Sequence, residues 1–447
     1  MCLNSDTYPP SVQSSVITVI IVIRILFFLL AVQCRHSCLI FAAALAAASP
    51  LTQHNEMILK HSLGDVPNVW ELKQPAPADL TINMHIQLKE ENLHKLQQRV
   101  LEISDPDHED YGKHMSKGDI NALTAPTNET IDIVTSWLAS HGVDAGKLSN
   151  GFMPVAITVA QAKALLGAEY GVYNHAKDQK HTVRAMQYSL PQKLHQSIVM
   201  VQPTTLFSDL GMSKAEKLSE PFVPDAVEAS RNVARSDIPL CDRQGTSPEC
   251  LGTLYNIQGY TPQSGQTTLG ITGFIGEDPS TDDLAKFLAK YTSIPADATY
   301  SVETINNGLN SNAGTEEANL DVQYSMALTY PIDNIFYSTS GQPPFNPDTG
   351  SPTNTNEPHL DGLNYMADLD SVPETISSSY SDDEQTVPKD YADAVCGQYM
   401  KLAARGVSVL IASGDHGAAG RLTTCLSNDG SENYQHVPTC NLTTLTT

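Results

Sequence analysis

The chain is poor in positive charge. Among its 447 residues, 26 are lysine or arginine and 50 are aspartate or glutamate, which gives a formal net charge of −24. A surface of this sign repels nucleic-acid phosphates, so no nucleic-acid partner is expected. The acidic balance suits a protein that stays soluble where carboxylates are partly protonated, although it could equally serve solubility alone.

Several motifs of other chemistries are also missing. The sequence has no Cys-x-x-Cys pair, no His/Cys cluster at zinc spacing, no Gly-rich phosphate loop and no Gly-x-Ser-x-Gly elbow. Two serines in glycine-rich settings do not replace that elbow. Gly245-Thr246-Ser247 precedes any catalytic strand and is interpreted as a loop, and Ser413 precedes a Gly-Asp turn and is interpreted as structural.

Residues 1–48 are predicted to be a targeting segment. An apolar stretch, 16–32, is interrupted by Arg24, and a second stretch, 38–48, ends in three alanines before Ser49. Small residues ahead of a polar break are typical of a signal-peptidase site. We therefore expect a secreted, extracellular protein without stable membrane association, with a signal anchor as the alternative.

Five cysteines follow the targeting segment, and secretion would allow them to form disulfide bonds. Five is an odd number, so one thiol is free or its partner is missing from this chain. The pairing stays open. Asn128-Glu-Thr130 and Asn441-Leu-Thr443 are possible glycan sites. The five cysteines are Cys241, Cys250, Cys396, Cys425 and Cys440.

Three regions are predicted after the targeting segment. Residues 57–209 alternate strand-like and helix-like patterns and are expected to form a compact α+β unit. Residues 210–236 are rich in Lys, Glu, Ser, Ala and Pro, which indicates an exposed, cleavable linker. The strand expected in the first region is Leu80–Leu88, and the helices are Glu90–Ile103, Thr130–His141 and Thr158–Leu166.

From residue 237 to residue 447 the pattern becomes α/β. Alternating strands and helices predict a parallel sheet with helices on both faces. The acidic segment Asp278–Asp283 is expected to open the first helix, and Gly341–His359 to form a surface loop. The expected strands are Thr267–Phe274, Ile332–Tyr337 and a buried Val407–Ala412, and the expected helices are Leu284–Tyr291, Ala318–Leu328 and Val387–Arg405.

Two acidic motifs are candidates for catalysis. Glu317 and Asp321 share one helix face, and two close carboxylates repel, so one tends to retain a proton. Asp415 follows a predicted strand and lies between glycines, at the end of a sheet where ligands bind. The alternatives are a solvated acidic pair and an aspartate that caps a turn. Glu316 should point about 100° away, and His416 is interpreted as an exposed loop residue.

These motifs resemble those of the sedolisin (serine-carboxyl peptidase) family. Glu317–Tyr324 is similar to its Glu…Asp motif, and Ala403–Gly417 to its oxyanion-aspartate motif. Three further segments resemble the family in the same order along the chain, and the likeness is strongest to fungal secreted tripeptidyl-peptidases. They are the activation-domain signature Asp105–Ser116, the start of the mature enzyme at Cys250–Asn256 and the substrate-cleft strand at Ser377–Glu384.

The resemblance implies an incomplete subtilisin-like α/β catalytic domain behind an activation prodomain, in a zymogen that releases tripeptides from polypeptide substrates in acid. Glu317 would be the general base, Asp321 its polarising partner and Asp415, when protonated, the oxyanion donor. The family's calcium is expected, but its C-terminal ligand motif does not occur in these 447 residues. Its Gly-Thr-Ser-x-Ser nucleophile motif does not occur either, so the chain is interpreted as catalytically incomplete.

Two other functions remain open. The chain could be a non-catalytic product whose prodomain acts as a chaperone or inhibitor of an intact peptidase. It could also be a secreted α/β binding module without peptidase chemistry.

We predict that a full-length transcript extends past Thr447 into a Gly-Thr-Ser-x-Ser segment. Sequencing the transcript checks this expectation, because the missing nucleophile motif should lie downstream of the oxyanion aspartate. A verified stop codon directly after Thr447 would contradict the enzymatic reading of this chain.

Overall fold

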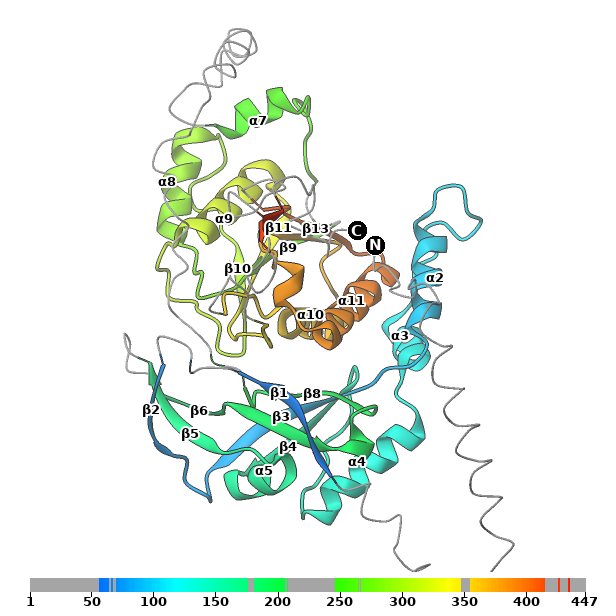
Figure 1. Ribbon diagram of the computed structural model, residues 1–447. Helices are drawn as coiled ribbons and strands as arrows, with labels where there is room; N and C mark the ends of the chain where they lie inside the picture. The colour runs from blue at the N-terminus through cyan, green and yellow to red at the C-terminus, as the bar shows by residue number, and fades with distance from the viewer. Residues whose placement is uncertain are drawn as a thin grey trace, which may run out of the picture.

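The protein is described from a computed structural model, in which two groups of elements pack against each other (Figure 1). One group is formed by residues before 210 and the other by residues after 245. The predicted targeting segment and linker lie outside the described residues. The described residues are 56–63, 66, 70–175, 181–205, 207, 246–263, 265, 267–346, 354–414, 425–426 and 433–434.

The N-terminal group combines antiparallel sheets with helices. Its sheets have the strand orders β1-β7, β2-β5-β6 and β4-β3-β8. The strand expected at Leu80–Leu88 is confirmed as β3. The strands are β1 Met57–Ser62, β2 Trp70–Pro75, β3 Thr81–Leu88, β4 Phe152–Thr158, β5 Tyr170–His175, β6 His181–Ala185, β7 Gln187–Pro191 and β8 Ile198–Gln202.

All three helices predicted in this group are confirmed as α2, α4 and α5. Local chemistry fixes the ends of α5: Thr158 and Gln161 form a reciprocal capping box, and Gly167 ends the helix at a φ of 58°. The helices are α2 Leu93–Ser104, α3 Lys117–Thr124, α4 Asn128–Ser140 and α5 Val159–Leu166, with a 3₁₀ turn, η2, at Gln192–Leu194.

The C-terminal group is built on a parallel sheet with the strand order β10-β11-β9-β12-β13. Three of its strands were predicted from their sequence patterns, and β10 was not, because it is short and only partly apolar. The strand that the family resemblance implies at Ser377–Glu384 shares only Ser377 and Ser378 with β12. Next to it in sequence, β14 and β15 form a short antiparallel pair. The strands are β9 Thr268–Gly273, β10 Ser301–Ile305, β11 Asp333–Thr339, β12 Thr375–Ser378, β13 Ser408–Ile411, β14 Cys425–Leu426 and β15 Asn433–Tyr434.

Helices cover both faces of this sheet, as the alternation predicted. On β11, Phe336 packs with α8 and α9, whereas the next residue, Tyr337, packs with α10 and α11. Gly273 makes room for the first of these rings, because a Cβ there would lie 2.1 Å from Phe336. The helices are α7 Pro248–Leu254, α8 Thr281–Tyr291, α9 Glu316–Thr329, α10 His359–Asp368 and α11 Lys389–Ala404, with a 3₁₀ turn, η3, at Glu384–Thr386.

Two details differ from the sequence-based expectations. β13 was predicted to be buried, but its residues are exposed or half-buried, and Leu410 is 61% exposed. The reason is that β13 is an edge strand within the described sheet. The described parts of Gly341–His359 contain no helix before His359, yet Gln342, Phe345 and Asn356 are buried, so this loop is not a surface loop.

The two groups meet through a polar contact that is buried from water. Lys401 of α11 donates to Glu90 and to Asn150, the latter at 2.7 Å, and the Lys401 and Glu90 side chains are 2% and 7% exposed. Burial raises the pKa of Glu90 and lowers that of Lys401, and the partner charge opposes each shift. In Figure 1, α2 and α3 lie alongside α11, and α2 and α11 are in contact.

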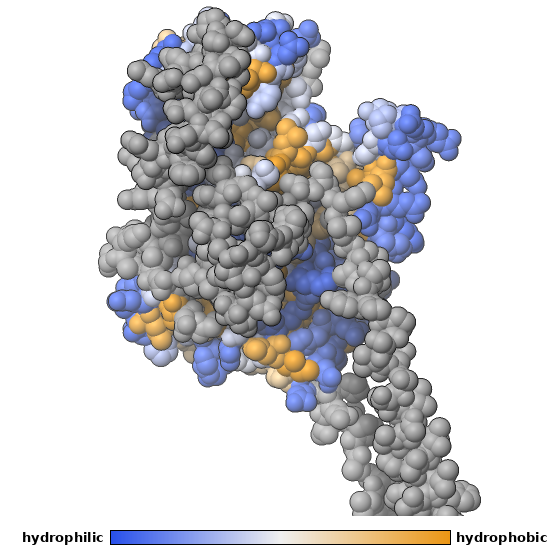
Figure 2. Space-filling view, turned by 45° about the horizontal axis from the view of Figure 1, so that its top comes forward, coloured by the Kyte–Doolittle hydropathy of each residue, from blue (hydrophilic) through white to orange (hydrophobic). Residues whose placement is uncertain are grey.

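The described surface carries its apolar side chains in separate patches among hydrophilic ones on the face that Figure 2 shows. Within the described residues, no helix combines the length and the apolar character needed to cross a membrane.

Cys250 and Cys396 are both disulfide-bonded.

Lys401→Met is expected to lower the free energy of unfolding by about 3–5 kcal/mol, because it leaves Glu90 buried beside an apolar side chain. The double substitution Glu90→Gln with Lys401→Met should cost less, since no unpaired charge is left. Urea denaturation near pH 7 measures both. The matched control is Lys389→Met, which removes an exposed ion pair with Asp393 on the same helix and should change stability by less than about 1 kcal/mol. Equal losses at positions 401 and 389 would show that the buried contact of Lys401 with Glu90 stabilises the fold no more than an exposed ion pair does.

Candidate active site at the carboxyl end of the sheet

Glu317 and Asp321 lie one turn apart near the start of α9. The same helix buries Val322 and Met326 against the sheet and exposes Leu320, so the two carboxylates occupy the half-buried border between core and solvent. Glu316, which was expected to point elsewhere, is exposed. The helix therefore holds the candidate pair against the protein instead of presenting it to solvent on its outer face.

Asp321 is anchored to the end of a strand. Ser379, the residue after β12, donates its hydroxyl to Asp321 Oδ1 at 2.6 Å. The other oxygen, Oδ2, is buried and has no hydrogen-bond partner among the described residues. A buried carboxylate oxygen without a donor favours the protonated acid.

The electrostatic environment strengthens that preference. Burial raises the pKa of Asp321 to about 7, the Ser379 hydroxyl opposes this rise, and the negative charges of Glu317 and Glu277 add to it. Asp321 is therefore largely protonated in acid, where its acid proton can be donated to a neighbouring carboxylate. Such a pair keeps one carboxylate ionised as a base while the other stays neutral.

Glu277 is a member of this site that the sequence analysis missed. It follows β9, and its Oε2 accepts a hydrogen bond from the backbone N–H of Ala318 at 3.0 Å, in the first turn of α9. The carboxylate satisfies one of the helix's free amides and interacts favourably with the helix dipole. Its position just past a strand in an α/β sheet was the available signal.

The acidic segment Asp278–Asp283 opens a helix as predicted: α8 begins at Thr281, Ser280 caps it, and Asp282 and Asp283 lie in its first turn. Asp278 itself lies before the cap and does not interact with this helix terminus. Instead, its buried Oδ2 accepts hydrogen bonds from Ser311 N, Ser311 Oγ and Ala313 N at 2.9, 2.6 and 3.1 Å. Its carboxylate thus fastens the loop that leads into α9.

Aromatic rings form the wall next to the carboxylates. Tyr380 packs edge-on against Phe274, with ring centroids 5.1 Å apart. Burial raises the pKa of the Tyr380 phenol well above its ordinary value, and the charges of Glu277, Asp321 and Glu317 add to this. The tyrosine therefore remains a neutral phenol beside three acidic side chains.

Asp415, the third predicted residue, lies outside the described residues. The chain leading to it is described as far as Gly414. β13 pairs in parallel with β12, and Ala412 N donates to Ser378 O at 2.9 Å. The residues just before position 415 therefore run beside the segment that carries Ser379.

Comparisons with known proteins bear on these motifs. The Pro-kumamolisin activation domain matches residues 68–207. The probable tripeptidyl-peptidase SED3 of Arthroderma benhamiae is 31% identical over 417 residues, which cover 90% of this chain and 68% of the relative. The chain belongs to the sedolisin family.

Two other relatives give similar values. Tripeptidyl-peptidase sed4 of Aspergillus fumigatus is 33% identical over 392 residues, covering 86% of this sedolisin and 63% of the relative. Tripeptidyl-peptidase SED4 of Arthroderma otae is 31% identical over 410 residues, with coverage of 89% and 66%. This sedolisin thus spans about two thirds of the length of these relatives.

Asp321→Asn is expected to reduce the pH dependence of stability. The carboxyl has a pKa of about 7 in the folded chain and roughly 3.9 when unfolded, so folding takes up a proton between these values. The wild-type free energy of unfolding should therefore fall as the pH rises from roughly 4 to 7, by up to about 4 kcal/mol from this group. Urea denaturation across this pH range measures the slope.

The control for this measurement is Glu316→Gln, on the same helix but exposed, which should keep the wild-type slope. If the free energy of unfolding of Asp321→Asn changed with pH as steeply as that of the wild type, the pKa of Asp321 would not be raised by its surroundings.

Proposed function

We propose that this sedolisin is a secreted precursor of a serine-carboxyl peptidase that acts in acid and releases tripeptides from the N-termini of polypeptides. The observation that carries the proposal is the buried carboxyl of Asp321, with a pKa of about 7, next to Glu317 at the carboxyl end of a parallel sheet. The relatives are named tripeptidyl-peptidases, which supports the proposed substrate class.

In this proposal, Glu317 is the general base and accepts the proton of a serine hydroxyl. Asp321 is protonated in acid, so it does not repel the ionised base and can donate a hydrogen bond to it. Glu277 and Ser379 are positioning residues, which hold the start of α9 and the Asp321 carboxyl. A carboxylate base with such a partner operates at a pH where histidine would be protonated and ineffective.

Asp415 would supply the second half of the chemistry. A carboxylic acid donates a hydrogen bond only when it is protonated, so an aspartate that stabilises an oxyanion requires low pH. The serine nucleophile would come from a Gly-Thr-Ser-x-Ser segment, and the catalytic domain would have a subtilisin-like topology. The activation domain, proposed to span 57–209, would be removed by cleavage within 210–236.

The calcium implied by the family has no fitting ligand set among the described residues. The one group of three potential metal-ligating side chains found there is Glu357, His359 and Asp382. Calcium takes oxygen ligands, and an imidazole nitrogen in the set does not suit it. A calcium site thus remains a prediction for the family's C-terminal motif.

The test is Glu317→Gln in a version of the protein that carries the serine segment. Removing the base should lower kcat by at least about 100-fold at a pH of roughly 4, because general-base catalysis typically contributes that much. Release of a chromogenic leaving group from a tripeptide substrate measures the rate. Glu316→Gln, the adjacent exposed glutamate, should keep wild-type activity.

Unchanged activity in Glu317→Gln would favour a binding module over a peptidase. The 447-residue chain gives a second comparison, in which it should hydrolyse no tripeptide substrate. If this chain slows an intact relative, the chaperone or inhibitor function is supported instead.

A further inference from the structure

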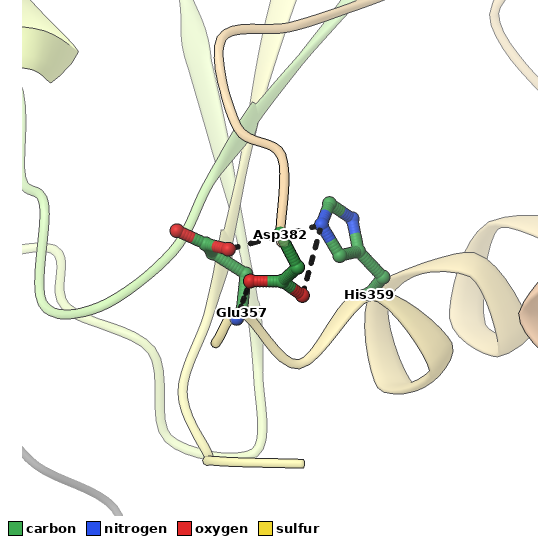
Figure 3. A group of neighbouring side chains, drawn as sticks. All are labelled: Glu357, His359 and Asp382. Carbon is green, nitrogen blue, oxygen red and sulfur yellow. Dashed lines mark hydrogen bonds and ion pairs between the residues drawn. The ribbon is translucent and has the colours of Figure 1, made fainter. Parts of the chain in front are cut away.

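A second group of ionisable side chains lies outside the catalytic carboxylates. Glu357, His359 and Asp382 are brought together from two segments, the stretch that enters α10 and the loop after β12 (Figure 3). Their side chains are 10%, 4% and 5% exposed. Two acidic groups and an imidazole are therefore held in a nearly dry environment, where ionisable groups are costly unless something neutralises them.

The three side chains converge on one point. His359 Nε2 lies 4.0 Å from Glu357 Oε2 and 4.0 Å from Asp382 Oδ2. These distances are too long for hydrogen bonds. One donor atom from each residue lies within 4.8 Å of the other two. Figure 3 shows the ring nitrogen directed toward both carboxylates.

Surrounding contacts fix this orientation. The backbone N–H of Glu357 donates to Asp382 Oδ1 at 3.3 Å, which leaves Oδ2 toward the imidazole. The His359 ring packs edge-on against Phe274, with centroids 4.9 Å apart, and its backbone N–H donates to Glu357 O at 2.8 Å. Ligands held by packing and by second hydrogen bonds are typical of metal sites.

Charge also favours a cation at this point. Asp382 has no lysine or arginine ion-pair partner within the described part of the chain, where its ionic neighbour is His359 at 4.0 Å. A dication would offset the negative charge of the two carboxylates.

We propose that Glu357, His359 and Asp382 form a site for one zinc ion. One imidazole and two carboxylates are ligands that zinc accepts, and a fourth position is left for water. Tetrahedral zinc with bonds near 2.1 Å requires donor atoms about 3.4 Å apart, so the imidazole nitrogen and each carboxylate oxygen must approach each other by roughly 0.6 Å. Side-chain rotation covers such a shift without moving the backbone.

The site would have a structural role. It would join the segment before α10 to the loop after β12. Ser379, which lies earlier in that loop, donates a hydrogen bond to Asp321. Phe274 touches both His359 and Tyr380, so the ion would lie behind the wall of the candidate active site and outside its reacting groups.

The experiment measures zinc binding to the full chain. Protein stripped with a chelator is titrated with zinc near pH 7 by isothermal titration calorimetry, in the wild type, in His359→Phe and in Asp382→Asn. We expect the wild type to bind one ion that both variants lose or bind at least about tenfold more weakly. His94→Gln, an exposed histidine on α2, is the matched control and should keep the wild-type value.

Circular dichroism shows whether each variant is folded. Asp382→Asn keeps the size of the side chain and the acceptor for Glu357 N–H, so it decides the matter if His359→Phe does not fold. Equal zinc stoichiometry and affinity in the wild type and a folded variant would overturn the proposal. Calcium binding in place of zinc, with the same dependence on Asp382, would overturn the assignment of the metal.

Discussion

Burial of carboxyl groups at the carboxyl end of the parallel sheet is the constraint on which the candidate chemistry depends. Asp321 is held there because α9 must bury Val322 and Met326, one and five residues further on, to cover the sheet. The helix cannot rotate to release the carboxyl without exposing those side chains. The raised pKa is thus a consequence of core packing, and the neighbouring acids add to a shift whose largest cause is desolvation.

Much of this arrangement could be predicted from the sequence, because it rests on periodic patterns. The i,i+4 spacing placed Glu317 and Asp321 together, and alternation identified three of the five strands of the parallel sheet. Glu277 was not predicted, because its role depends on a contact with a helix about forty residues away, and its position just past a strand does not identify that partner. The hydrogen bonds of Asp278 were not predicted for the same reason, since its partners are in the loop at 311–313.

Local sequence patterns also could not predict how deeply some segments are buried. Val407–Ala412 reads as a buried strand because it is apolar, but burial depends on what lies on each side of it. Within the described residues, β13 pairs only with β12. The loop 341–359 shows the opposite error: its polar and proline-rich composition suggested a surface, yet Asn356 is buried and donates a hydrogen bond to Thr386 of η3 at 3.0 Å. Composition predicts average burial, whereas these two segments depend on specific partners.

The response of the fold to pH follows from the same packing. Burial raises the pKa of Asp361, as of Asp321, to about 7, so both favour the folded chain in acid and lose this contribution as the pH rises from roughly 4 to 7. Burial lowers the pKa of His61 to about 4, which opposes folding as the pH falls from roughly 6.5 to 4. Desolvation is the largest cause of each shift. Because buried groups are screened less than surface charges, the pH dependence from these three residues should change little with salt concentration.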